Sequence, residues 1–241
     1  MVLSGGFHME YFKSINMEQN RRTVNFLHIG KTGGTSLKTA LRPYVSFGHY
    51  NISLHKHGFR LRQLPPGELA VFFLRNPVTR FVSGFNSRLR RGMPRYFVPW
   101  TVREKTAFKQ FSTANQLALA LSATNDDERT AAEYAMHSIA HVKDVYARWF
   151  DSEDYFLSRL SDTFFIGFQE SLSTDFEKLK LKLGLPSHIQ LPCGEIETHK
   201  TPASFDQSLE PQAKENLINW YQDDMRFFKL CKQLVADKRI L

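Results

Sequence analysis

Residues 28–36 read HIGKTGGTS and place one lysine among three glycines and three hydroxyl residues. Glycines let backbone N–H groups approach an anion closely, and a helix that begins here presents its positive end to the same anion. Lys31 adds a full positive charge. The stretch therefore predicts a phosphate-binding loop, whose candidate ligand-binding residues are Lys31, Thr32, Gly33, Gly34, Thr35 and Ser36.

This loop differs from the Walker loop of nucleotide triphosphatases, although it contains the triplet Gly-Lys-Thr. A Walker loop reads G-x-x-x-x-G-K-[ST], and Asn25 occupies the position of its first glycine. The next predicted strand ends at Arg75, where a triphosphatase would carry an aspartate that holds magnesium. Both differences argue against ATP chemistry at a loop that is nevertheless suited to phosphate.

A second polar cluster, RNPVTRFVS, begins at Arg75 directly after the apolar run LAVFFL. Asn76 is expected to cap a helix here, and Pro77 to occupy its first turn. Arg75 then lies at the end of a strand, and Ser83 lies two turns into the helix. Arg80 is expected either to join these hydrogen-bond donors or to pair with a nearby acid.

Histidines between the two clusters are candidates for a general base, since a neutral imidazole accepts a proton near neutral pH. The sequence SLHKHGF contains His55 and His57, and in an extended segment such alternate residues share one face. Both rings would then point into one cleft; the alternative is a pair of solvated loop histidines. His49 is a reserve candidate, whereas His137 and His141 are expected on a solvated helix face rather than at a metal site.

Together the two clusters resemble the motifs of sulfotransferases that use 3′-phosphoadenosine-5′-phosphosulfate (PAPS). In that family a K-T-x-x-[TS]-S loop after the first strand binds the 5′-phosphosulfate, and R-[DN]-P-x-x-R-x-x-S binds the 3′-phosphate. Residues 31–36 match the first motif and residues 75–83 match the second, in the same order. The chain looks most like the carbohydrate branch that contains the heparan and dermatan 2-O-sulfotransferases, which carry an H-x-H pair in this region. A weaker likeness extends through FFIGFQESLSTDFEKLKLKLGL.

The resemblance implies that PAPS is the donor and 3′-phosphoadenosine-5′-phosphate (PAP) is the product. Lys31 would stabilise the charge that develops on the leaving 5′-phosphate, and the loop hydroxyls and amides would complete the cradle. Arg75 and Ser83 would hold the separate 3′-phosphate.

The resemblance also implies that His57 is the general base, with His55 in support, because the second histidine of the H-x-H pair is the base in the relatives. Lys200 and Thr201, in THKTPASF, are expected to contact phosphate before the last helix. No metal is expected, since the lysine and the positive loop do what magnesium does in kinases.

Strands that alternate with helices predict an α/β fold, in which a parallel central sheet is covered by helices on both faces. The resemblance implies the P-loop-like sulfotransferase fold with a helical insertion. Strands are expected at residues 24–29, 69–74 and 162–168, and helices at 36–43, 76–92, 104–122, 128–150, 174–186 and 211–235.

The chain is expected to divide into a poorly ordered tail at residues 1–22 and a single domain at residues 23–241. The helical insertion at residues 93–160 is expected on the side of the acceptor, because the resemblance does not reach it. Cys193 and Cys231 lack the spacing of a metal site or a disulfide scaffold and are expected to be idle thiols in a reducing compartment.

The formal charge of +8, from 32 basic and 24 acidic residues, favours anionic partners. We expect a glycan or another hydroxyl-bearing acceptor, which can itself be anionic, and neither nucleic acid nor a membrane as partner. No apolar run is long enough to span a bilayer. The expected location is the cytoplasm of a bacterial-type cell, or the Golgi lumen if an anchor has been removed.

Two other functions stay open on the sequence alone. The Gly-Lys-Thr triplet is compatible with an ATP-dependent small-molecule kinase, against which the spacing and the missing aspartate count. The positive charge alone is compatible with a non-catalytic module that binds polyanions.

Overall fold

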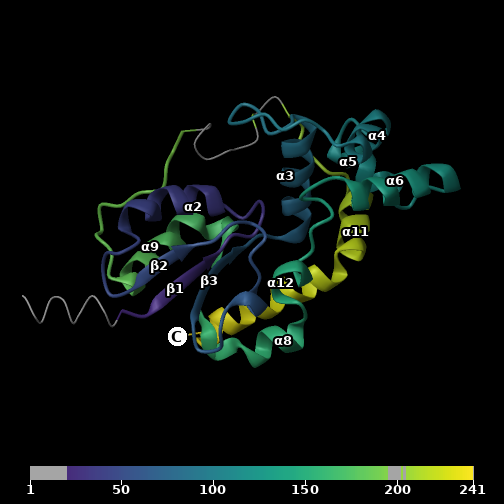
Figure 1. The fold of residues 1–241 in the computed structure, drawn as a ribbon. Coiled ribbons are helices and arrows are strands. Elements are labelled where there is room, and N and C mark those ends of the chain that lie inside the picture. Colours follow the sequence, from purple (N-terminus) through teal and green to yellow (C-terminus); the bar gives the residue numbers. More distant parts are fainter. Residues whose placement is uncertain (1–20, 195–201, 203–204, 241) are drawn as a thin grey trace, which may run out of the picture.

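A computed structural model describes residues 21–194, 202 and 205–240 of the chain. Its centre is a parallel sheet of four strands in the order β2-β1-β3-β4 (Figure 1). The strands are β1 (Thr23–Leu27), β2 (Asn51–Leu54), β3 (Leu69–Leu74) and β4 (Thr163–Phe168). The expected α/β fold with a parallel central sheet flanked by helices is confirmed.

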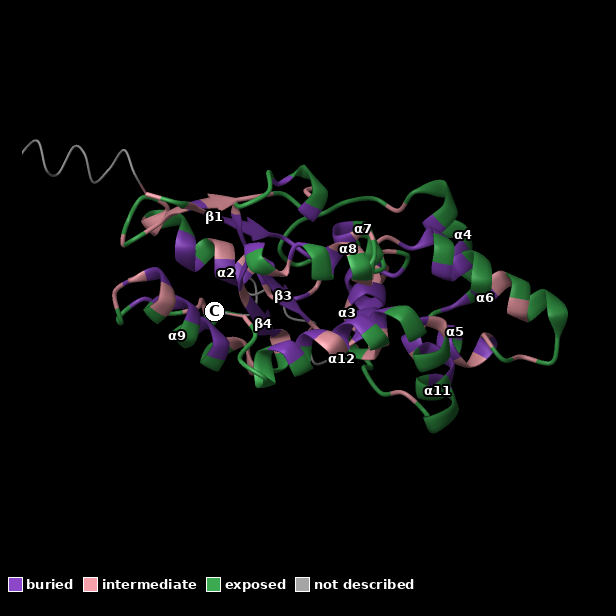
Figure 2. Ribbon diagram, turned by 90° about the horizontal axis from the view of Figure 1, so that it is seen from below, coloured by how far each residue is buried: buried purple, intermediate pink, exposed green. Residues whose placement is uncertain are grey.

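Successive side chains along each strand point to opposite faces of the sheet. In β3, Val71 and Phe73 belong to one apolar cluster, and Phe72 and Leu74 belong to another. The first cluster is completed by α2 (Gly34–Leu41) and α9 (Leu172–Leu183), and the second by α7 (Ala147–Phe150), α8 (Glu153–Ser158) and α12 (Gln222–Ala236). Both faces of the sheet are therefore covered, and β1, β3 and β4 are mainly buried, whereas the edge strand β2 is only partly buried (Figure 2).

A third apolar cluster lies beside the sheet and is built mainly from helices. Its core residues include Phe81, Phe85, Leu117, Met136 and Leu217, each 2% exposed or less. The helices concerned are α3 (Pro77–Leu89), α4 (Val102–Gln110), α5 (Ala114–Ala120), α6 (Asp126–Ser138) and α11 (Pro211–Trp220). Because α3 begins at the end of β3 and packs into this cluster, it joins the sheet to the helical part (Figure 1).

The three predicted strands are present, but the sequence prediction omitted β2. β2 has only four residues, NISL, and they pair in parallel register with residues 23–26 of β1. So short a run carries little periodicity, and its partner strand determines that it is extended. The strand matters for function because it leads directly to His55 and His57.

The helix expected at residues 104–122 is two helices, α4 and α5. Phe111 has an extended backbone at the end of α4, and the side chain of Thr113 accepts a hydrogen bond from the Gln116 N–H to begin α5. α4 itself starts at Val102, two residues earlier than expected, since Thr101 and Glu104 form a reciprocal capping box.

The helix expected at residues 128–150 is also wrong, because α6 ends at Ser138. Ile139 is extended and His141 has a left-handed backbone with φ of 67°, so the chain leaves the helical path before the short helix α7. Ile139 and Val142 are nevertheless fully buried. Their apolar spacing therefore reflects burial in an irregular segment rather than one helix face.

The last expected helix, residues 211–235, divides into α11 and α12 at Tyr221. The Tyr221 hydroxyl donates to the Val142 carbonyl at 2.7 Å, which anchors the break to the segment after α6. Residues 1–20 of the expected N-terminal tail lie outside the described part of the chain, whereas Arg21 and Arg22 donate to the carbonyls of Ser46 and Gly67. Four 3-10 turns, at Arg42–Tyr44, Leu61–Gln63, Leu160–Asp162 and Gln169–Ser171, join these elements.

Candidate functional site

A cavity of about 830 Å³ opens where the carboxyl ends of the strands meet. The segment after each strand contributes to it: Lys31 follows β1, His57 follows β2, Arg75 follows β3 and Gln169 follows β4. In open parallel sheets this edge is the usual place for a ligand. The residues that line the cavity are His28, Lys31, Gly33, Gly34, Thr35, Ser36, His57, Arg75, Ser83, Arg95, Tyr96, His141, Gln169, Leu172, Ser173, Leu191, Pro192, Cys193 and Gln207.

The predicted phosphate loop turns sharply between β1 and α2. Gly33 has a left-handed backbone with φ of 87° and caps α2, whose first residues, Gly34 to Ser36, line the cavity. Gly34 is also required for packing, because a Cβ there would lie 2.2 Å from Cδ2 of His28. The positive end of α2 therefore faces the cavity, which is the arrangement that favours a bound anion.

Lys31 occupies a left-handed position of the same loop, with φ of 70°. Burial, assisted by the positive charges of Arg90 and Arg75, lowers the pKa of Lys31 to about 7. No aspartate or glutamate is among the described residues that line the cavity. The loop thus gathers positive charge that no lining carboxylate offsets, and an anion would relieve this repulsion.

Thr32 has a different role from the one expected. Its side chain is buried, it does not line the cavity, and its hydroxyl donates to the Ile29 carbonyl at 3.0 Å. Thr32 therefore closes the turn that shapes the loop, while Thr35 and Ser36 reach the cavity.

Arg75 and Ser83 both line the cavity, as the sequence predicts. The Arg75 guanidinium donates from Nε to the Thr79 hydroxyl at 3.0 Å and from Nη1 to the Lys31 carbonyl at 3.4 Å. Its backbone is fixed by the buried hydroxyl of Tyr146, which accepts from the Arg75 N–H and donates to the Arg75 carbonyl. The arginine is therefore held beside the phosphate loop.

The start of α3 is fixed by the predicted cap. The Asn76 side chain accepts from the Val78 N–H at 3.0 Å, and the Asn76 N–H donates to Glu170 at 2.7 Å. Arg80 takes the second of its two expected roles: it is buried and donates to Asp224 at 3.0 Å. Arg80 does not line the cavity and instead ties α3 to α12.

His57 lies at the cavity, on the segment that follows β2. Its backbone carbonyl accepts from the indole N–H of the buried Trp149 at 2.9 Å. Its ring lies 3.7 Å from the ring of His28, measured between centroids. Partial burial and the charge of Lys38 lower the pKa of His57, against a hydrogen bond to the His28 backbone that raises it. The ring is thus mainly neutral at pH 7, the form in which it can accept a proton.

His55 does not share this cavity, so the expectation that both rings of the pair point into one cleft is wrong. Its Nε2 pairs with the Asn25 side-chain oxygen at 2.8 Å, and its ring stacks on Phe59 at 3.6 Å. The reserve candidate, His49, packs against Gly184 instead and is likewise outside the cavity.

Two histidines of the cavity were not predicted. His28, the first residue after β1, is buried, and burial with the charges of His57 and Lys38 lowers its pKa to about 3. His141 was expected on a solvated helix face, but it follows the end of α6 and its ring lies 6.0 Å from that of His57. The position of His28 at a strand end was a usable signal, whereas nothing local indicates the turn that brings in His141.

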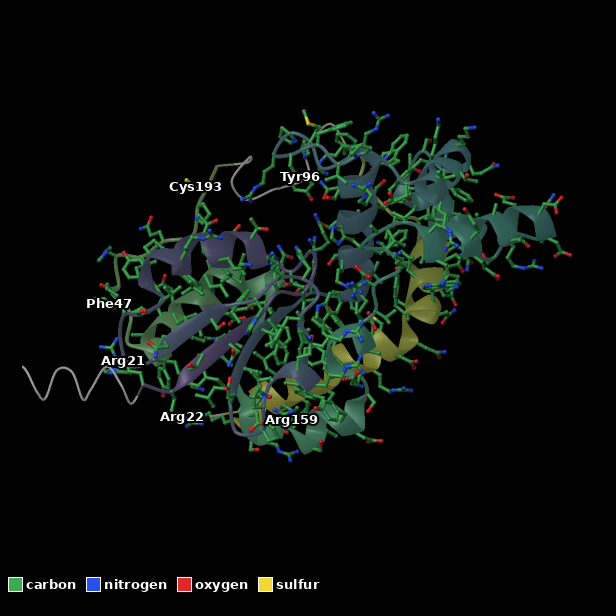
Figure 3. All side chains as sticks on the ribbon, viewed as in Figure 1. Arg21, Arg22, Phe47, Tyr96, Arg159 and Cys193 are labelled. Atoms are coloured by element: carbon green, nitrogen blue, oxygen red, sulfur yellow. The ribbon has the colours of Figure 1, made fainter. Side chains whose placement is uncertain are left out.

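Arg95 and Tyr96 bring the segment after α3 to the cavity, and residues 191–193 bring the segment after α9. Tyr96 and Cys193 lie along the same side of the molecule, above α3 and α2 (Figure 3). Lys200 and Thr201 lie outside the described residues. Both cysteines are free, Cys193 exposed and Cys231 buried.

Within the described part of the chain, no group of three or more His, Cys, Asp or Glu residues is placed to hold a metal ion. Among the helices of the same residues, none is long and apolar enough to cross a membrane.

One comparison with known proteins, against protein-family models, yields a match. Residues 15–230 match the model of the sulfotransferase family, a range that includes the phosphate loop, His57 and Arg75. Neither the curated proteins nor the solved structures yield a match to the chain.

Proposed function

The chain belongs to the sulfotransferase family, and we propose that it transfers a sulfuryl group from PAPS to a hydroxyl of a carbohydrate-containing acceptor. Enzymes of this family generally use PAPS as donor and release PAP. One observation carries the proposal: the lysine loop and the arginine–serine pair line the same cavity. PAPS has two phosphorylated ends, and a cavity lined by both groups of anion-binding residues suits such a molecule.

The positive and hydroxyl-bearing residues of the cavity support an anionic donor. Lys31 and the start of α2 would hold the 5′-phosphosulfate, and Arg75 with Ser83 would hold the 3′-phosphate. Leu172, Leu191 and Pro192 would supply apolar surface for the adenine between them. Thr32 would act through the shape of the loop, since its hydroxyl already has the Ile29 carbonyl as partner.

PAPS supplies an activated sulfuryl group, and the protein must handle one proton and one developing charge. The bond between sulfur and the 5′-phosphate oxygen breaks, and its electron pair stays on the phosphate, where Lys31 would offset the charge. The acceptor oxygen forms the new bond to sulfur in line with the leaving oxygen, and its proton would pass to His57. His55 would act indirectly, by fixing the segment that carries His57 through Asn25.

The carbohydrate acceptor is proposed from the resemblance to the 2-O-sulfotransferases and from the walls of the cavity. About 830 Å³ is at the upper end of small-ligand pockets, so the cavity has room beside a bound nucleotide. Arg95 and Tyr96, which belong to the segment between α3 and α4, would face the acceptor. An aromatic ring and a guanidinium suit a sugar that carries acidic groups.

The proposal is tested by incubating the protein with PAPS and a panel of desulfated glycans and small alcohols, with the release of PAP as readout. We expect turnover in the wild type and a loss of about a hundredfold or more in His57→Ala, with PAP binding retained. His137→Ala is the control, because His137 is an exposed histidine on α6. Full turnover in His57→Ala would refute the base assignment, and a wild type that binds no PAP would refute the proposed function.

A further inference from the structure

His141 occupies a backbone conformation that few residues other than glycine adopt, with φ of 67°. Two glycines pack closely against this residue, Gly30 against its ring and Gly84 against its Cβ and backbone. A Cβ on Gly30 would lie 3.0 Å from Nδ1 of His141, and a Cβ on Gly84 would lie 3.1 Å from the His141 Cβ. Gly30 immediately precedes Lys31, and Gly84 immediately follows Ser83. Both anion-binding segments therefore pack directly on His141, which holds a strained backbone conformation between them.

The position of the ring relative to the other groups indicates its role. His141 lines the cavity with Lys31 and His57, and after burial the charges of these two residues act most strongly on it. Burial and both charges lower the pKa of His141 well below its ordinary value, so the ring is neutral and has one N–H to donate. Its Nδ1 lies toward Gly30 and is 4.0 Å from the Asp144 carboxylate, which is beyond hydrogen-bond distance, and that carboxylate pairs with Arg148 instead. The proposal below therefore places the single ring proton on Nε2.

We propose that His141 is a further catalytic residue that donates a hydrogen bond to an oxygen of the sulfuryl group during transfer. This inference rests on the proposed function, in which Lys31 holds the leaving phosphate oxygen and His57 receives the proton of the acceptor. The sulfur lies between the leaving and the attacking oxygen, so a donor beside both Lys31 and His57 faces the sulfuryl oxygens. His141 takes up no proton and forms no bond; it stabilises the group while one sulfur–oxygen bond breaks and the other forms.

The test measures the affinities for PAPS and for PAP by calorimetry, without any acceptor. Because the two ligands differ only in the sulfuryl group, the ratio of their affinities reports contacts to that group. The variant is His141→Asn, since asparagine tolerates the left-handed backbone and lacks the imidazole. We expect His141→Asn to weaken PAPS binding about tenfold relative to PAP, which is the size of one hydrogen bond to a charged group. His137→Ala, from the helix that precedes this segment, should leave the ratio of the two affinities unchanged.

Each other result has a separate meaning. If His141→Asn weakens PAPS and PAP equally, His141 only shapes the cavity, and the inference is overturned while the proposed function stands. The same holds if neither affinity changes. If the wild type binds neither nucleotide, the proposed function fails and the inference fails with it. A thermal unfolding curve for His141→Asn shows whether the variant is folded, and His141→Gly, which also permits this backbone, replaces it if it is not.

Discussion

At the scale of single residues, the site depends on Lys31, whose charged form is disfavoured by burial and by neighbouring positive charges. Lys31 lies in a cavity with Arg75 and near Arg90, and its pKa is lowered to about 7. With that pKa, the lysine is only partly charged at pH 7 in the free protein. A phosphate group would raise the pKa again, so that binding draws a proton onto Lys31 between the pKa of the free protein and the higher pKa of the complex.

This coupling predicts that PAP binds more weakly as pH rises above about 7. Above that pH the free lysine is neutral and the bound lysine is charged, so each complex takes up a proton and the affinity falls by up to about tenfold per pH unit. Below about pH 7 the lysine is charged in both states and contributes no slope. Calorimetry in buffers of different ionisation enthalpy measures the proton uptake directly.

Lys31→Arg is the control, because an arginine stays charged throughout this range. Its PAP affinity should change little between about pH 7 and pH 9. A wild type with the same flat profile would contradict the assignment of Lys31 to a phosphate.

The residues of the two motifs were predictable because their chemistry is local. Each motif lies within nine consecutive residues: one has a lysine among glycines, and the other has an arginine before a capped helix. Lys31, Arg75 and Ser83 all line the cavity. His141 was not predictable, since its place depends on a turn that no local pattern encodes. The direction of His55 was also misjudged, because Asn25 and Phe59 hold its ring elsewhere.

At the scale of elements, the start of α2 is packed directly against the histidines. His28 lies between Gly34 and the ring of His57, at 3.7 Å from the latter. The phosphate loop and the proposed base are therefore in contact through one buried ring. A substitution at the start of α2 should therefore alter the position of the His57 ring.

We expect Gly34→Ala to lower kcat by about a hundredfold, because its Cβ would lie 2.2 Å from His28 and displace both rings. Overpacking of this kind should also lower the free energy of unfolding by about 1–3 kcal/mol. Steady-state kinetics and thermal unfolding check the two effects. Gly58→Ala is the matched control, because a Cβ at Gly58 meets no atom within 4 Å. If Gly34→Ala and Gly58→Ala have the same kcat and the same stability, the packing of Gly34 against His28 has no effect on function.

Helices and strands were predictable where the sequence has a continuous apolar run or a clear helix cap. β1, β3, β4 and α3 carry continuous apolar runs or a clear cap, and all are present. The long helices expected at 104–122 and 128–150 were wrong, because apolar residues continue at helical spacing through segments that are buried without being helical. β2 was missed, since its backbone is set by pairing with β1 rather than by its own four residues.

At the scale of the whole molecule, the sheet, α3 and the helical cluster act as one support for the cavity. Arg80 on α3 pairs with Asp224 on α12, and Asp224 also accepts from the Tyr146 N–H at 2.8 Å. The hydroxyl of that same Tyr146 fixes the backbone of Arg75. A buried network thus connects the covering helices to the proposed 3′-phosphate clamp.

The central claim is that one cavity holds the two phosphorylated ends of the same nucleotide, and a comparison of PAP with adenosine 5′-monophosphate tests it most directly. The two ligands differ only in the 3′-phosphate. The wild type should bind PAP about a hundredfold more tightly, and Arg75→Ala should lose most of this preference while its affinity for the monophosphate stays nearly constant. Equal binding of both ligands by the wild type, or an undiminished preference in Arg75→Ala, would contradict the account.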